Sequence, residues 1–164
     1  MIELIDAEIN RLFPIYGVGV NADGSYRIDY MEGTTEEQKL QANEIVDRIA
    51  LIEAKKVKLA QIDADFDSIT RQGWDSGQGF SLGITAQDVS LLVGLFVLAK
   101  EASAIGLNPP PVIDMNGGIH TFTMQELTML MLQYGQARSQ ISANDATRRK
   151  AVENATTIEE VNNI

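Results

Sequence analysis

The sequence predicts a mainly helical α+β protein, and three observations lead to that fold class. No glycine or proline interrupts residues 34–72, so one long helix can occupy them. Upstream, "IYGVGV" and "SYRIDYM" flank "NADG", where Asp23-Gly24 is typical of a hairpin turn. Threonine followed three residues later by Asp, Glu or Gln recurs before apolar runs, as in Thr85/Asp88, and this spacing is typical of helix capping boxes.

The composition indicates a folded chain with an acidic surface. Of its 164 residues, 45% are hydrophobic and 22% are charged, ordinary values for a domain with a core. A formal net charge of −10 disfavours contacts with phosphate, so we expect no nucleic-acid partner. The chain has no cysteine, which removes disulfides and thiolate chemistry.

Neither a secretory leader nor a membrane span is predicted. The first residues, MIELIDAEIN, are acidic and amphipathic, unlike the basic start of a signal peptide. The most apolar run, Val89–Ala99, is about half the ~20 residues that a membrane span needs. We therefore expect no membrane partner.

The chain divides by pattern into regions 1–33, 34–72 and 73–164. In the first, isoleucines at positions 2, 5 and 9 stand at helical spacing and predict a short helix, which the hairpin follows. The second is a long helix that starts at a capping box formed by Thr34 and Glu37 or by Thr35 and Gln38. At 1.5 Å per residue it would be roughly 55 Å long, so part of it is expected to project or to pack on another chain.

The apolar seam of this helix allows two interpretations. Its residues follow alternating steps of three and four, with one slip of three, which suits an oligomeric coiled coil. Isoleucine at both kinds of seam position favours a trimer over a dimer. The other interpretation is an amphipathic helix lying on its own domain, and both stay open. The seam residues are Ile45, Ile49, Ile52, Leu59, Ile62, Phe66 and Ile69.

Region 73–164 reads as two strand-then-helix units and a short terminal helix. The expected elements are a strand at 80–82, a helix from Thr85 to Ile105 ended by Gly106, a hairpin turn at 116–118, a helix from Thr123 to Asn154 and a helix after Thr157. Capping boxes at Thr85, at Thr123 and at Thr156 or Thr157 start these helices. The repeated motif is therefore predicted to be architectural rather than a repeated active site.

Two apolar surfaces of this region point to partners or to a core. The helix after Thr85 is apolar on nearly all sides, so it should be buried against the second unit or against a neighbouring subunit. The next helix carries Met124, Met129 and Met131, a methionine stripe that suits core packing or an adaptable groove for a partner.

Candidate metal and catalytic residues each have a simpler explanation. Asp63, Asp65 and Asp67 resemble the start of a calcium loop, but the glycine and glutamate that such a loop needs are absent, so a solvated helix face is expected. Asp114 suits a tight hairpin better than a cation site. His120, the only histidine, lacks a nucleophile motif and is expected to be a half-buried strand residue.

The basic residues near the C-terminus do not change this conclusion. Arg138, Arg148, Arg149 and Lys150 lie among acidic residues, where i,i+4 ion pairs on a helix explain them better than nucleic-acid binding does. The sequence assigns no catalytic, metal-binding or cofactor-binding residue, and no cofactor is expected.

Much of the C-terminal half consists of the stretches "GGIHTFTMQELTMLMLQYGQARSQI" and "RRKAVENATTIEEVNNI". They resemble a domain of unknown function found in bacteriophage tail-fibre and tail-associated proteins. The resemblance implies a virion tail component that is assembled in the host cytoplasm with other tail or baseplate proteins. It implies no catalytic residues.

Three functions are thus expected in descending order. The first is a non-enzymatic structural protein of a phage tail fibre or baseplate, forming a homo-oligomer in which a trimer is favoured. The second is a tail-fibre assembly chaperone that is absent from the mature virion. The third, from another class, is a tail-associated hydrolase that cleaves host glycans with two carboxylates.

Overall fold

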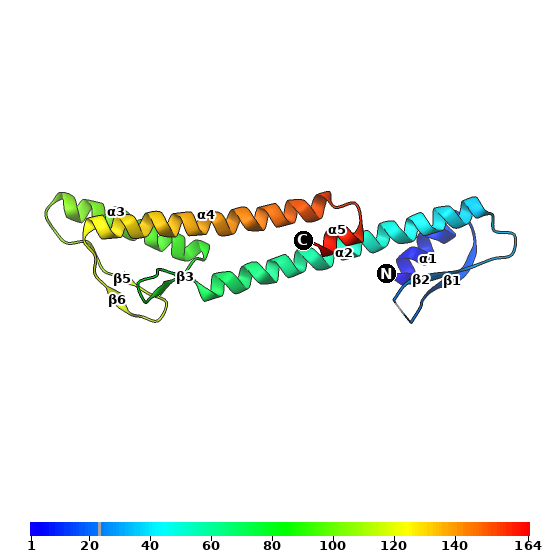
Figure 1. Ribbon diagram of the computed structural model, residues 1–164, viewed down its shortest axis with the longest axis horizontal. Coiled ribbons are helices and arrows are strands. Elements are labelled where there is room, and N and C mark those ends of the chain that lie inside the picture. The colour runs from blue at the N-terminus through cyan, green and yellow to red at the C-terminus, as the bar shows by residue number, and fades with distance from the viewer. Residues whose placement is uncertain (23) are drawn as a thin grey trace. The chain divides into compact units, whose positions relative to one another are not determined.

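The protein is mainly helical α+β with 62% helix, as the sequence predicts, and the computed structural model describes residues 1–22 and 24–164 (Figure 1). Packing divides the chain into two units. Unit 1 consists of residues 1–59 and 151–164, and unit 2 of residues 60–150. Two long helices, α2 (Glu36–Gln72) and α4 (Met124–Asn154), each contribute residues to both units.

Unit 1 begins with a short helix and the predicted hairpin. Helix α1 (Ile2–Asn10) is followed by β1 (Ile15–Val20) and β2 (Tyr26–Tyr30), which pair antiparallel with a register shift near Gly17. Gly24 adopts a positive φ of 85° in the connection. The other predicted turn residue, Asp23, lies outside the described residues.

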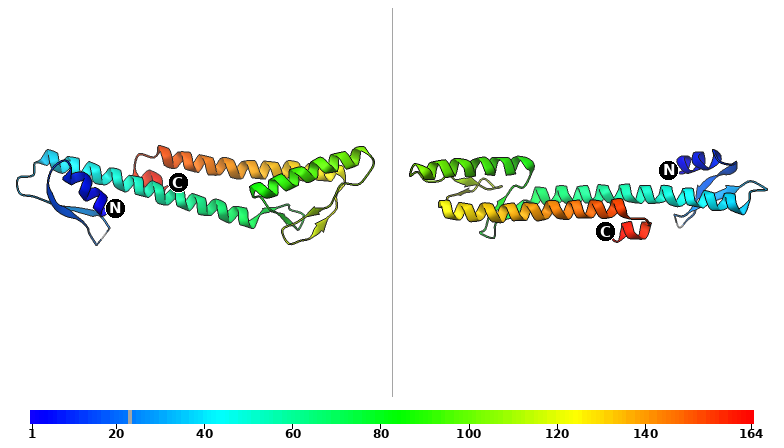
Figure 2. Two further views of the ribbon diagram at one scale, coloured as in Figure 1. Left: turned by 180° about the vertical axis from the view of Figure 1, so that it is seen from behind. Right: turned by 90° about the horizontal axis from the view of Figure 1, so that it is seen from above.

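The core of unit 1 forms where α1 and the hairpin cover the first part of α2 (Figure 2). Ile5 and Ile9 of α1 are completely buried there, and Glu8 pairs with Arg48 of α2 at 2.9 Å. The buried cluster comprises Ile5, Ile9, Phe13, Ile15, Ala42, Ile45 and Ile49. The first two members of the predicted seam on α2 are thus used within the chain.

The start of α2 resolves the two alternatives that the sequence leaves. The Gln38 amide N–H donates to the Thr35 hydroxyl at 3.3 Å, and the Gln38 side chain accepts from the Thr35 N–H at 2.9 Å. The Thr34 hydroxyl instead donates to the Met31 carbonyl at 2.7 Å. Thr35 and Gln38 therefore form the capping box, which satisfies backbone donors that a helix start leaves unpaired.

The end of the chain also packs on α2 within unit 1. Helix α5 (Ile158–Asn162) starts at the predicted capping box of Thr157 and Glu160. Val152 and Val161 are buried, and Lys55 of α2 donates to the Glu153 carbonyl at 2.8 Å.

Unit 2 contains two small hairpins, each of which leads into a helix. Strand β3 (Trp74–Asp75) pairs with β4 (Ser81–Leu82) before α3 (Ala86–Ala104). Strand β5 (Val112–Ile113) pairs with β6 (Ile119–His120) before α4. The sequence predicts all of these elements except β3, because Gly73, Gly77 and Gly79 made residues 73–79 look like a break.

The core of unit 2 lies between α3, α4 and the hairpins. Its buried members are Phe80, Leu82, Ile84, Leu92, Ala99, Val112, Leu127, Leu130 and Tyr134. The Tyr134 hydroxyl donates to the Gly83 carbonyl at 2.7 Å, and its ring meets Trp74 edge to face at 5.6 Å between centroids. Burial raises the pKa of Tyr134 above its ordinary value.

Ion pairs join α2 to α4 within unit 2. Arg149 forms the predicted i,i+4 pair with Asp145 at 2.8 Å, but it also reaches Asp63. Arg148 pairs with Asp65 at 2.9 Å. Asp63 and Asp65 were expected on a solvated helix face. Asp63 is exposed and Asp65 is partly exposed, but both also pair with arginines of α4. Hydrogen bonds to Asp145 and Asp63 raise the pKa of Arg149.

A close approach of backbone segments at Gly73 yields a first prediction. A Cβ atom there would lie 2.7 Å from the Leu82 carbonyl oxygen, whereas one at Gly77 would meet no described atom within 4 Å. Both glycines have similar positive φ, 75° and 70°. We expect Gly73→Ala to lower the free energy of unfolding by about 1–3 kcal/mol more than Gly77→Ala does. Urea denaturation measures this difference, and equal losses in both variants would contradict a role for the close contact.

Candidate functional site

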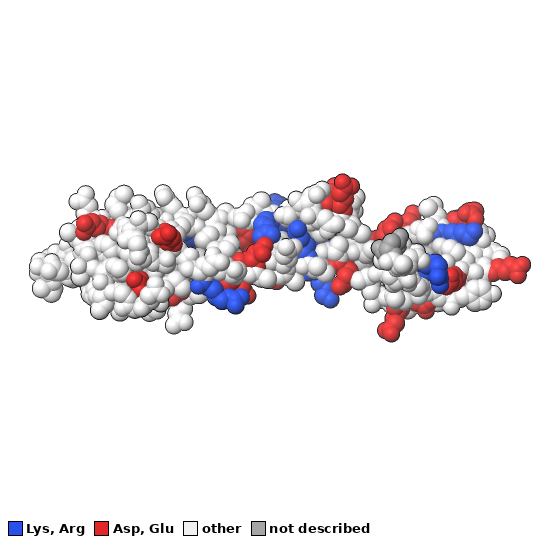
Figure 3. All heavy atoms as spheres, turned by 60° about the horizontal axis from the view of Figure 1, so that its bottom comes forward, with Lys and Arg blue, Asp and Glu red and all other residues white. Residues whose placement is uncertain are grey.

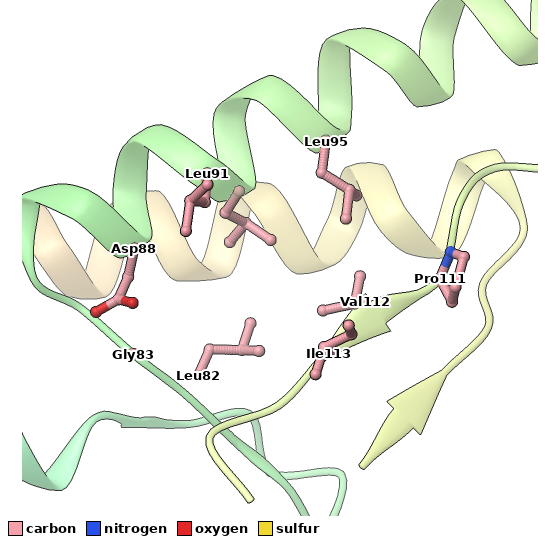
Figure 4. A pocket seen from close by; sticks show the side chains of 9 residues that line it. Leu82, Gly83, Asp88, Leu91, Leu95, Pro111, Val112 and Ile113 are labelled. Carbon is pink, nitrogen blue, oxygen red and sulfur yellow. The ribbon is translucent and has the colours of Figure 1, made fainter. Parts of the chain in front are cut away.

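An apolar groove of unit 2 lies between α3, β4 and β5 (Figure 4). Its volume is about 300 Å³. Figure 4 shows Leu91 and Leu95 descending from α3 toward Leu82, Val112 and Ile113. The full lining is Leu82, Gly83, Asp88, Leu91, Leu92, Leu95, Pro111, Val112 and Ile113. These walls suit apolar side chains of another molecule.

The single carboxylate of the groove is committed to a helix cap. Asp88 Oδ2 accepts from the Thr85 N–H at 3.0 Å and from the Thr85 hydroxyl at 2.6 Å. A Cβ at position 83 would lie 2.4 Å from the Asp88 carboxylate, so any larger residue there would require the capping side chain to move. This arrangement fixes the start of α3 over the groove and gives Asp88 a structural role.

The groove has a buried floor and an exposed rim. Leu82, Leu92 and Val112 belong to the core of unit 2. By contrast, Leu91 is 65% exposed and Ile113 is 64% exposed. Apolar side chains this exposed at the edge of an apolar hollow are typical of protein interaction surfaces.

A second hollow, on the α4 side of unit 2, is more polar. It is lined by Gln78, Thr121, Phe122, Gln125, Glu126, Met129 and Gln133. Glu126 is again held by a cap, because its carboxylate accepts from the Thr123 N–H and hydroxyl, both at 2.8 Å. These two hydrogen bonds lower the pKa of Glu126.

The predicted methionine stripe is divided between the core and this hollow. Met124 and Met131 are partly buried and pack on the core of unit 2. Met129 is 53% exposed and lies in the lining of the polar hollow. Of the three, Met129 is therefore the one most accessible to a partner.

The predicted oligomer seam on α2 is also divided. Ile45 and Ile49 are buried in unit 1, and Ile62 is buried in unit 2 beside a small hollow lined by both α2 and α4. Leu59 and Phe66 are partly exposed, and Ile52 and Ile69 are exposed. Self-association through this seam stays a prediction, and Ile52 and Ile69 are the seam residues that remain exposed.

The candidate residues Asp114 and His120 meet at the second hairpin of unit 2. Asp114 Oδ1 accepts from the N–H groups of Asn116 and Gly118 at 2.7 and 2.8 Å, and Oδ2 lies 2.8 Å from His120 Nε2. The His120 ring stacks on Phe80 with 4.0 Å between centroids. The hydrogen bond from His120, followed by those from the backbone, lowers the pKa of Asp114. Both residues thus stabilise the turn.

Two further searches cover only the residues that the structure describes. Among them, no cluster of three or more His, Asp or Glu side chains has the arrangement of a metal site. Likewise, none of their helices combines the length and apolar character needed to cross a membrane.

Comparisons with known proteins give no match for this chain, whether made against family models, curated proteins or solved structures.

The groove itself was not predicted from sequence, although one signal pointed toward it. The apolar character of α3 on nearly all sides implied that one neighbour in the chain would leave part of the helix uncovered. The uncovered part of α3 adjoins Ile113 because of where β5 lies. No local sequence pattern predicts that position.

The hydrogen-bonded carboxylates predict an acid-sensitive fold. The pKa values of Asp114, Glu126 and Glu160 are lowered in the folded state, so their contribution is complete above the unfolded values of about 4 and is lost as the pH falls below them. We expect the melting temperature to be level above about pH 5 and to drop below about pH 4.

Glutamine variants provide the control for this pH dependence. A Glu126→Gln and Glu160→Gln variant keeps side chains that can complete a capping box but cannot titrate. Its melting temperature should fall less steeply between pH 5 and pH 3. An unchanged slope, measured by circular dichroism, would show that these caps do not carry the acid sensitivity.

Proposed function

We propose that this chain is a non-enzymatic structural component of a bacteriophage tail, in a tail fibre or attached to the baseplate, and that it acts through protein–protein assembly. One observation supports an assembly role most directly. Large apolar side chains of α3 and of the groove rim are exposed together in unit 2, with Leu91, Leu98 and Ile113 each more than 60% exposed. Exposed apolar patches of this kind are typical of surfaces that a protein partner covers.

The resemblance of the C-terminal half to a phage tail domain supports the more specific part of the proposal. The partners are then other tail or baseplate proteins and further copies of this chain, with a trimer favoured by the isoleucines of α2. The site of action is the virion tail, after assembly in the host cytoplasm.

A tail-fibre assembly chaperone is the second candidate. The exposed Met129 beside the glutamine-lined hollow favours it, because methionine adapts its shape to different partner surfaces. A chaperone would bind its client during assembly and would be absent from the finished particle.

Quantitative mass spectrometry of purified virions of the encoding phage tests the proposal. Peptides of this chain should be present at a constant ratio to the major capsid protein, corresponding to a copy number that is a multiple of three. The infected-cell lysate provides the matched sample. Abundance in the lysate together with absence from gradient-purified virions would overturn the structural role and would support the chaperone.

A further inference from the structure

The outward side of α3 is an exposed, mainly apolar helix surface of unit 2. It comprises Ser90, Leu91, Gly94, Val97, Leu98 and Glu101, all exposed, and is called here the α3 outer face. These residues recur in steps of three and four, so they share one side of the helix. The opposite side, with Leu92 and Ala99, is buried in the core.

Gly94 lies at the centre of the α3 outer face. A glycine inside a helix is less favourable than alanine, and no described atom lies within 4 Å of the position that a Cβ would take. Packing within the chain therefore does not require glycine here. A small residue at the centre of an exposed apolar stripe would, however, allow the backbone of another helix to approach closely.

The charge distribution favours a second copy of this chain as the occupant. The chain carries a net charge of −10, so copies repel one another over most of their surface. Residues 89–99 contain no charged side chain. On the face drawn in Figure 3, the end of unit 2 that carries the hairpins is likewise largely uncharged, with isolated acidic groups. Two acidic copies can therefore meet along residues 89–99 with little repulsion.

The residues flanking Gly94 are complementary to themselves in one orientation only. Asp88 and Lys100, six residues before and after Gly94, lie about 120° around the helix from it, so they flank the α3 outer face and do not enter the contact. Gln87 and Glu101, seven residues before and after Gly94, lie on the same side of the helix as Gly94. In an antiparallel pair of helices centred on Gly94, Glu101 of each copy comes level with Gln87 of the other. A parallel pair would instead place the two Glu101 carboxylates level and bring like charges together.

The apolar and polar positions follow the same relation. Around Gly94, Leu91 comes level with Val97 of the second copy, and Gln87 comes level with Glu101. The first pair buries two apolar side chains, and in the second an amide can donate to a carboxylate. We therefore propose that two copies of this chain associate through the α3 outer face, antiparallel, with a two-fold axis beside Gly94.

This two-fold contact is independent of the phage-tail assignment and of association through α2. Removing the α3 contact separates the two copies that it joins, which halves the mass of a dimer.

Disulfide trapping tests the contact and its direction, because the natural chain has no cysteine. In the antiparallel pair, Gly94→Cys places two thiols beside the axis. Gln87→Cys places them roughly 21 Å apart along the helices, beyond the reach of a disulfide. We expect covalent dimers of Gly94→Cys and none of Gln87→Cys, whereas a mixture of Gln87→Cys and Glu101→Cys chains should form the mixed dimer.

The trapping experiment has clear contrary outcomes. Crosslinking of both single variants alone would show a parallel contact and would overturn the proposed orientation. Crosslinking of neither would overturn the interface. Positions 87 and 94 are both exposed, and circular dichroism checks that each variant keeps the helix content of the natural chain.

Matched leucine variants provide a second, independent test. Leu98 on the α3 outer face is 64% exposed, and Leu132 on α4 is 57% exposed. We expect Leu98→Glu to halve the mass measured by sedimentation velocity, since it buries a charge in the contact, while Leu132→Glu keeps the natural mass. A Leu98→Glu chain with unchanged mass, or a natural chain that is monomeric, would contradict the proposal.

Discussion

The position at which each helix of unit 2 begins is fixed by an exchange of hydrogen bonds between a threonine and an acidic side chain, and the rest of the unit depends on it. Thr85 and Asp88 start α3 directly after one hairpin, and Thr123 and Glu126 start α4 directly after the other. Because each cap orients a helix relative to the strand before it, the buried sides of α3 and α4 face the same core. Gly83, which leaves room for the Asp88 carboxylate, is part of this device.

The same geometry determines which side of α3 is left uncovered. The helix is apolar on nearly all sides, but α4 and the hairpins cover only the side that carries Leu92 and Ala99. Burying apolar surface contributes about 25 cal/mol of free energy per Å², and a side chain left in water does not gain this contribution. An uncovered row of leucine and valine is therefore unfavourable for an isolated chain. The fold thus buries a core in unit 2 and still leaves the apolar outward side of α3 exposed.

The sequence predicted the local structure well because local chemistry determines it. Capping boxes and the uninterrupted run without Gly or Pro indicated the helices. Glycine-containing turns indicated the β1–β2 and β5–β6 hairpins. The two-residue strand β3 was missed, since Trp74 and Asp75 stand among glycines that resemble a loop. The two interpretations of the α2 seam could not be separated because periods of 3.5 and 3.6 differ little over a few turns. Burial of Ile45 and Ile49 depends on α1 and the hairpin, which are distant in sequence.

Charge explains why assembly would concentrate on one surface of so acidic a chain. The ion pairs that join Arg148 and Arg149 to aspartates of α2 use basic side chains within unit 2, which leaves acidic groups in excess elsewhere. Such an excess keeps copies apart wherever charge is exposed. Association is then favourable only where charge is absent and apolar area is available together. On the described surface of unit 2, the outward side of α3 meets both conditions, so the distribution of charge selects the contact as much as the apolar side chains stabilise it.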